Sequence, residues 1–224
     1  MTSFYLVPKW FYGVDVAMEI AFALVTLLVA FVAFKIYRVT DQEDFKFFGA
    51  SFGLISLSYI LWAGINLFLV SELQGSVKTL GLSDFRFFSF LGIFLFVLFF
   101  LLGLITLVYT VFKVRDIRIY ALFFMLVLLL VSLSENRALA FYFTSFILLG
   151  FLLSHYGLEY RNNPTKKKFS IFFAFILLFI SPVGFLLSEQ HYIFYVVGHV
   201  LELIAYSIIL VNILLVLKHE QKKK

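Results

Sequence analysis

The sequence predicts an all-α, polytopic membrane protein: a single seven-transmembrane-helix bundle that takes in residues 1–224. Composition is the first observation behind this prediction, because 63% of the residues are hydrophobic and only 14% are charged. A soluble domain carries about 25% charged residues. The second observation is that the apolar residues are gathered into seven long segments, separated by short polar links. The mean hydropathy of the whole chain is +1.04, so little sequence is left for a soluble domain.

The seven predicted spans cover residues 14–36, 47–70, 87–111, 119–133, 138–155, 169–187 and 192–217. An α-helix rises about 1.5 Å per residue, so about 20 apolar residues cross a hydrocarbon core. The first two spans are separated by the charged sequence DQEDFK, and the third is almost entirely apolar. The fourth and fifth are short and are joined only by SENR, which predicts an antiparallel hairpin in the membrane. The alternative is six spans, with the fourth and fifth segments forming a re-entrant pair.

The distribution of basic residues predicts the orientation of the bundle. Fourteen of the 18 Lys and Arg residues lie on one side, in the first–second, third–fourth and fifth–sixth links and the C-terminal tail. The other four are Lys9, Lys78, Arg86 and Arg137. Cytoplasmic loops are enriched in Lys and Arg, so we expect an outside N-terminus, a cytoplasmic C-terminus and a place in the cell membrane. The same residues are expected to contact anionic lipid headgroups, and no nucleic-acid partner is expected.

Ionisable side chains within the spans point to a functional site, because charges at membrane depth are costly. The predicted orientation places polar residues of four spans at a similar depth, in the outer half of the bundle. The second span contributes the arc of Tyr59, Trp62 and Asn66, and the sixth contributes the Ser181-Pro182 pair. On the seventh helix, Tyr195, His199, Glu202 and Tyr206 fall within one arc at helical spacing. The complete candidate pocket consists of Asp15, Glu19, Trp62, Asn66, Tyr195, His199, Glu202 and Tyr206.

The candidate pocket has three interpretations from sequence. A structural clasp would hold the helices together through hydrogen bonds. A ligand or proton site would use the same side chains for binding. A metal site would use Glu19, His199 and Glu202, since an imidazole and carboxylates can bind Zn²⁺ or iron. We expect Glu19, His199 and Glu202 to approach one another, with Trp62, Asn66 and Tyr206 beside them.

Several kinds of cofactor and chemistry are not expected. The chain has no Cys, which excludes disulfides, thiolate metal sites and iron–sulfur clusters. Haem is not expected either, because the four His residues lie at different predicted depths: His155, His191, His199 and His219. No GxSxG, HExxH, P-loop or glycine-rich nucleotide motif occurs. The sequence therefore favours a role other than that of an enzyme.

Three segments carry a resemblance to microbial rhodopsins. These are VTDQEDFKFFGASFGLISLSYI, SPVGFLLSEQ and HVLELIAYSIILV, which resemble that family's first cytoplasmic link with its second helix, its proline-containing sixth helix and its seventh helix. The resemblance implies a seven-helix bundle with an extracellular N-terminus. Leu203 stands where the family has its retinal lysine, and His199 stands where it has an acidic counter-ion. No covalent retinal is therefore expected, and the resemblance does not imply light sensing.

These observations favour a receptor-like or sensor-like membrane protein with an outward-facing polar pocket. Because the chain has no effector domain, it is expected to act through a membrane or cytoplasmic protein, and a homo-oligomer fits the same description. The alternative is a small transporter or channel for protons, ions or a small solute. A metal-dependent intramembrane enzyme is the third interpretation.

Overall fold

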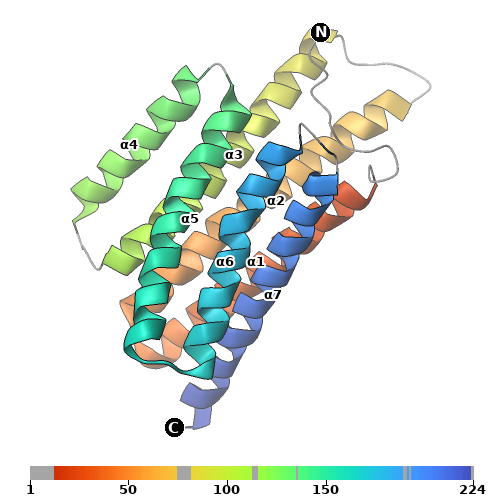
Figure 1. Ribbon diagram of the computed structural model, residues 1–224. Coiled ribbons are helices and arrows are strands. Elements are labelled where there is room, and N and C mark those ends of the chain that lie inside the picture. Colours follow the sequence, from red (N-terminus) through yellow and green to blue (C-terminus); the bar gives the residue numbers. More distant parts are fainter. Residues whose placement is uncertain are drawn as a thin grey trace.

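The computed structural model describes residues 13–74, 82–112, 116–134, 136–188, 191 and 193–222, with the side chains of residues 69–74 and 82–86 left aside. These residues form seven α-helices (Figure 1). The helices are α1 (Val14–Thr40), α2 (Glu43–Gln74), α3 (Leu82–Phe112), α4 (Ile117–Leu133), α5 (Arg137–Asn162), α6 (Lys166–Leu187) and α7 (Ile193–Lys222). The predicted all-α class and the number of helices are confirmed for the described part of the chain.

Six of these helices are long and apolar enough to cross a membrane, which makes the chain a polytopic helical membrane protein. The exception is α4, whose 17 residues extend about 26 Å at 1.5 Å per residue, against a core of about 30 Å. Several helices continue beyond the predicted spans. For example, α5 reaches Asn162 rather than residue 155, because backbone hydrogen bonding does not stop where the apolar sequence stops. Tyr192, the first residue of the last predicted span, lies outside the described residues.

The helices alternate in direction, so consecutive helices are antiparallel. In Figure 1 the α1–α2 and α5–α6 links and the end of α7 all lie at the lower end of the bundle. Six helices pack as a closed ring in the order α1, α2, α3, α5, α6, α7, and α7 returns to α1. By contrast, α4 packs only against α3 and α5, on the outside of the ring. The ring thus encloses the interior in which a site can form.

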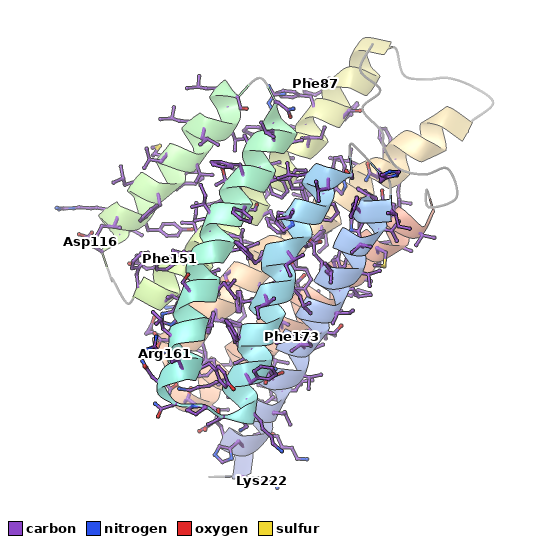
Figure 2. All side chains as sticks on the ribbon, in the orientation of Figure 1. Phe87, Asp116, Phe151, Arg161, Phe173 and Lys222 are labelled. Atoms are coloured by element: carbon purple, nitrogen blue, oxygen red, sulfur yellow. The ribbon has the colours of Figure 1, made fainter. Side chains whose placement is uncertain are left out.

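Exposed fractions of the side chains match this arrangement. Large side chains buried inside the ring include Phe22, Phe52, Phe175 and Tyr206, each no more than 2% exposed. Many leucines and phenylalanines lie on the outer faces, as expected of a surface that contacts lipid. In α4 only Val131 is buried, which fits its place outside the ring. Figure 2 shows Arg161 and Lys222 at the lower end of the bundle and Phe87 toward the upper end.

Glycines allow close helix contacts at two crossings. A Cβ atom at Gly103 of α3 would lie 2.8 Å from the Ser51 carbonyl oxygen and 2.6 Å from Cγ1 of Ile55, both on α2. A Cβ atom at Gly184 of α6 would lie 3.1 Å from the Phe194 carbonyl oxygen of α7. Small residues let backbones approach in membranes, where packing and not hydrophobic burial drives helix association. Pro182 is accommodated within α6, which continues to Leu187.

Candidate functional site

Glu202 of α7 lies inside the ring and accepts hydrogen bonds from two other helices. Glu202 is 8% exposed. The Ser181 hydroxyl of α6 donates to Oε1 at 2.7 Å, and the Tyr59 hydroxyl of α2 donates to Oε2 at 3.2 Å. The hydroxyls of Tyr59 and Tyr206 lie 3.4 Å apart. The carboxyl group is therefore the point at which α2, α6 and α7 meet through polar contacts.

His199 lies one turn before Glu202 on α7 and contacts α1. Its Nε2 atom is 3.2 Å from Oδ1 of Asp15. The Tyr195 hydroxyl donates to the same Asp15 oxygen at 2.8 Å. Both partners of the charge contact are largely buried, with side-chain exposures of 9% for His199 and 13% for Asp15. The remaining exposure of Asp15 lies at the end of the bundle where α1 begins.

Aromatic rings surround the His199 imidazole and fix its position. The ring of Phe22 stacks on it at a centroid distance of 5.6 Å and an interplanar angle of 22°. The rings of Phe185 and Tyr195 meet it edge-on, at 5.0 Å and 4.6 Å. Such apolar walls exclude water from the imidazole and strengthen its electrostatic interaction with nearby carboxylates. Those carboxylates are Asp15 on α1 and Glu202 on α7.

Glu19 makes the third polar contact, between α1 and α2. It is 2% exposed, and the Asn66 amide donates to its two oxygens at 3.2 Å each. The Trp62 side chain also donates a hydrogen bond to this carboxyl group. Asp15 lies one turn earlier on the same helix. The contacts of Glu19, Asp15 and Glu202 form three neighbouring polar clusters over α1, α2, α6 and α7, which we call the polar network. Asp15 and Glu19 lie one turn apart on α1, and His199 and Glu202 lie one turn apart on α7.

All eight candidate residues identified from sequence take part in this network. The expected arrangement differs in one respect, because Asp15 occupies the place beside His199 that the sequence assigned to Glu19. The two helices α1 and α7 run in the same direction and are in register such that Asp15 is level with Tyr195 and His199. One turn further along, Glu19 is left to bind Asn66. The register between helices distant in sequence decides this pairing.

Two further members of the network, Tyr59 and Ser181, were placed at this depth by the sequence but were not included in the candidate pocket. Tyr59 is 4% exposed and Ser181 is fully buried. A signal for Tyr59 exists, since it lies three residues before Trp62 and seven before Asn66, on the same helix face. Ser181 precedes Pro182, and the predicted orientation of the sixth span placed this pair at the depth of the other polar groups. Its role follows only from the packing of α6 against α7.

The set proposed from sequence as metal ligands does not gather around a common point. Among the residues that the structure describes, no group of three His, Cys, Asp or Glu side chains is placed to hold a metal ion. Both carboxylate oxygens of Glu202 accept hydrogen bonds from hydroxyls, and those of Glu19 accept from Asn66. These oxygens serve helix contacts, which fits a hydrogen-bonded network rather than a metal centre.

A small cavity of about 20 Å³ lies beside Glu202 and Tyr206, enclosed by residues of α2, α3, α5, α6 and α7. Beyond it, toward the end where α7 finishes, the ring interior is filled by apolar side chains such as Phe52, Ile209 and Ile213. Asn212 donates to the Ser170 hydroxyl at 2.9 Å in a separate contact between α6 and α7. Within the described residues, no hydrogen bond joins that contact to the contacts of Glu202. The network is therefore one-sided.

Comparisons with protein-family models, with characterised proteins and with solved structures find no match for this chain. The resemblance to microbial rhodopsins and the absence of a covalent retinal thus stay predictions. The function has to be argued from the polar network itself.

Proposed function

We propose that this protein is a seven-helix membrane sensor that responds to protons through Asp15 and His199 and acts through a partner protein. The observation that carries this proposal is the contact of 3.2 Å between the His199 imidazole and the Asp15 carboxylate, in a largely buried position. An unperturbed imidazole changes charge within the physiological pH range. A buried imidazole beside a carboxylate at the edge of a bundle is suited to detect protons from one side of the membrane.

Protonation of His199 would change the forces between helices. The imidazolium attracts Asp15 of α1 and also Glu202, one turn away on α7. Loss of the proton leaves Asp15 with the hydroxyl of Tyr195 and without a charge partner. From α6 and α1 the imidazole faces the rings of Phe185 and Phe22, which carry no charge. The proton therefore acts chiefly on the α1–α7 contact, and Glu202 transmits the change to α2 and α6.

The dimensions of the site favour protons over an organic ligand. The cavity beside Glu202 measures about 20 Å³, whereas pockets for drug-sized molecules measure about 300–1,000 Å³. A one-sided network also favours sensing over transport, because a carried proton would need polar groups as far as the other end. The transporter alternative nevertheless has a specific observation in its favour, the series of acidic and hydroxyl groups from Asp15 to Tyr206.

The orientation of the bundle is part of this proposal. With α4 as a seventh crossing, the N-terminus is outside, the C-terminus is cytoplasmic, and Asp15 faces the outside of the cell membrane. The links at the lower end of Figure 1 hold most of the basic residues, which supports this orientation. The partner would then meet the cytoplasmic end, as a membrane protein, a cytoplasmic protein or a second copy of this chain.

Epitope tags test the orientation. A tag at the N-terminus should be labelled by antibody on intact cells, and a tag at the C-terminus only after permeabilisation. The physical reason is the excess of Lys and Arg at one end of the bundle. Labelling of both termini from the same side would show that α4 does not cross, and labelling of the C-terminus in intact cells would reverse the orientation.

The fluorescence of Trp62 tests proton sensing, since this side chain contacts Glu19 in the network. The experiment uses the full chain in lipid nanodiscs with Trp10→Phe, which leaves Trp62 as the single tryptophan. We expect its emission to change in a one-proton transition when the pH is scanned. The change should be absent in His199→Gln.

Two histidines outside the network provide matched controls. His155 on α5 and His191 before α7 can each be replaced with Gln, and the transition should remain. A transition that survives in His199→Gln, or that disappears in His191→Gln, would contradict the role of His199. Proton flux into liposomes that contain a pH dye distinguishes a transporter from a sensor. Flux through the wild-type protein that is lost in Glu202→Gln would identify a transporter.

A further inference from the structure

Ser145 of α5 differs from the other buried hydroxyl residues of the described chain. It is 1% exposed, yet its Oγ atom has no hydrogen-bond partner among the described residues. Its neighbour Thr144 donates back to the Ala140 carbonyl at 2.7 Å, and Ser58 donates to the Ile55 carbonyl at 2.6 Å. These two follow the usual behaviour of hydroxyls in helices. A buried hydroxyl without a partner is unfavourable, so we expect a bound partner at Ser145.

Ser145 lines the cavity of about 20 Å³ together with Glu202 and Tyr206. Leu178 and Pro182 of α6 line the same space. Pro182 has no N–H group, so it cannot donate to the carbonyl of Leu178, four residues earlier, as other residues of a helix do. The Leu178 carbonyl therefore lacks its usual helical donor, and Leu178 lines the same cavity as the unpartnered hydroxyl and the carboxyl group.

The volume and the lining residues of the cavity determine which kind of ligand fits in it. A space of about 10–15 Å³ or more can hold one water molecule, which needs two to four polar partners. Eleven of the 15 lining residues are apolar. A metal cation that takes six or more oxygen ligands would find too few of them here, and an organic molecule would not fit. One uncharged molecule with both donor and acceptor groups satisfies all three polar positions.

We propose that this cavity is a binding site for a single water molecule that joins Glu202 of α7 to Ser145 of α5. The Ser145 hydroxyl donates to the water oxygen, and the water donates to the Glu202 carboxylate and to the Leu178 carbonyl. The bound water extends the hydrogen-bonded contacts of Glu202 from α2 and α6 to α5. The site does not depend on the proposed proton sensing.

X-ray radiolytic labelling in H₂¹⁸O, read by mass spectrometry, tests this site on the full chain in nanodiscs. Radiolysis of a bound water oxidises the side chains beside it, even when they are buried. We expect Tyr206, which is 2% exposed, to be labelled much faster than Phe22, which is fully buried and does not line the cavity. In Ser145→Ala the labelling of Tyr206 should fall to the level of Phe22.

Ser58→Ala is the matched control, because it removes a buried hydroxyl that already has a carbonyl partner. Its Tyr206 labelling should equal that of the wild type. Slow labelling of Tyr206 in the wild-type protein would overturn the proposal, even if Ser145→Ala did not fold. Equal labelling of wild type and Ser145→Ala would also overturn it. Neither result bears on His199, whose role is tested separately by the Trp62 transition.

Discussion

Replacement of Gly103 with alanine should destabilise the bundle by about 1–3 kcal/mol, the usual cost of overpacking a well-packed interior. The new Cβ atom would lie 2.8 Å from the Ser51 carbonyl oxygen and 3.2 Å from the backbone nitrogen of Ile55. Backbone atoms of a helix cannot move aside as the end of a side chain can, so α3 would have to withdraw from α2. The free energy of unfolding in mixed detergent micelles measures the effect.

Gly64 of α2 offers the matched control for this substitution. A Cβ atom there would meet nothing within 4 Å. Alanine is favoured over glycine in a helix interior by about 1 kcal/mol, so Gly64→Ala should leave the protein unchanged or stabilise it. The two glycine substitutions should therefore have opposite signs. If both stabilise the protein to the same extent, α2 and α3 do not cross as closely as the structure indicates.

Hydropathy alone was sufficient to predict the helices, because a helix in lipid satisfies its own backbone hydrogen bonds and needs an apolar surface. The polar side chains of α1, α2 and α7 were also predictable as one group, since a charge in a membrane has to find a partner. Their depth followed from the alternating direction of the helices. The candidate pocket was thus predicted from the spacing of polar residues within each helix and from the orientation that the distribution of basic residues indicates.

The individual pairings could not be predicted in the same way. Asp15 rather than Glu19 contacts His199 because of the register between α1 and α7, which depends on the packing of side chains such as Phe22 and Phe185 around the imidazole. Ser145 is one of several hydroxyl residues of α5, and most Ser and Thr residues in helices bond to their own helix, as Thr144 and Ser154 do. Only the three-dimensional arrangement shows that Ser145 instead faces the cavity beside Glu202.

The position of α4 outside the ring could not be predicted from the sequence either. Its 17 residues include one buried side chain, Val131, and it packs against α3 and α5 without entering the ring. Apolar composition predicts a helix in lipid but does not distinguish a helix of the ring from one outside it. All members of the polar network lie on ring helices. The site therefore lies within the ring of six helices, and α4 contributes no side chain to it.

Replacement of Glu202 with leucine should have the largest effect among changes within the network. The substitution leaves the hydroxyls of Ser181 and Tyr59 buried without their acceptor. An unsatisfied buried donor costs about 1–3 kcal/mol, so two of them should destabilise the bundle by about 2–5 kcal/mol in the same micelle assay. Glu202→Gln should cost less, because its amide oxygen still accepts from one hydroxyl. Glu43→Gln, at an exposed ion pair with Lys46, should change stability by less than about 0.5 kcal/mol.

A combined variant distinguishes lost hydrogen bonds from lost packing. Removal of both partners of a buried hydrogen bond costs far less than removal of one. Addition of Ser181→Ala and Tyr59→Phe to Glu202→Leu should therefore restore part of the stability that Glu202→Leu alone removes. The recovery should be incomplete, because Tyr59→Phe also removes the contact with the Tyr206 hydroxyl. If the triple variant is less stable than Glu202→Leu, the three side chains contribute independently, and Glu202 does not hold α2 and α6 through these hydroxyls.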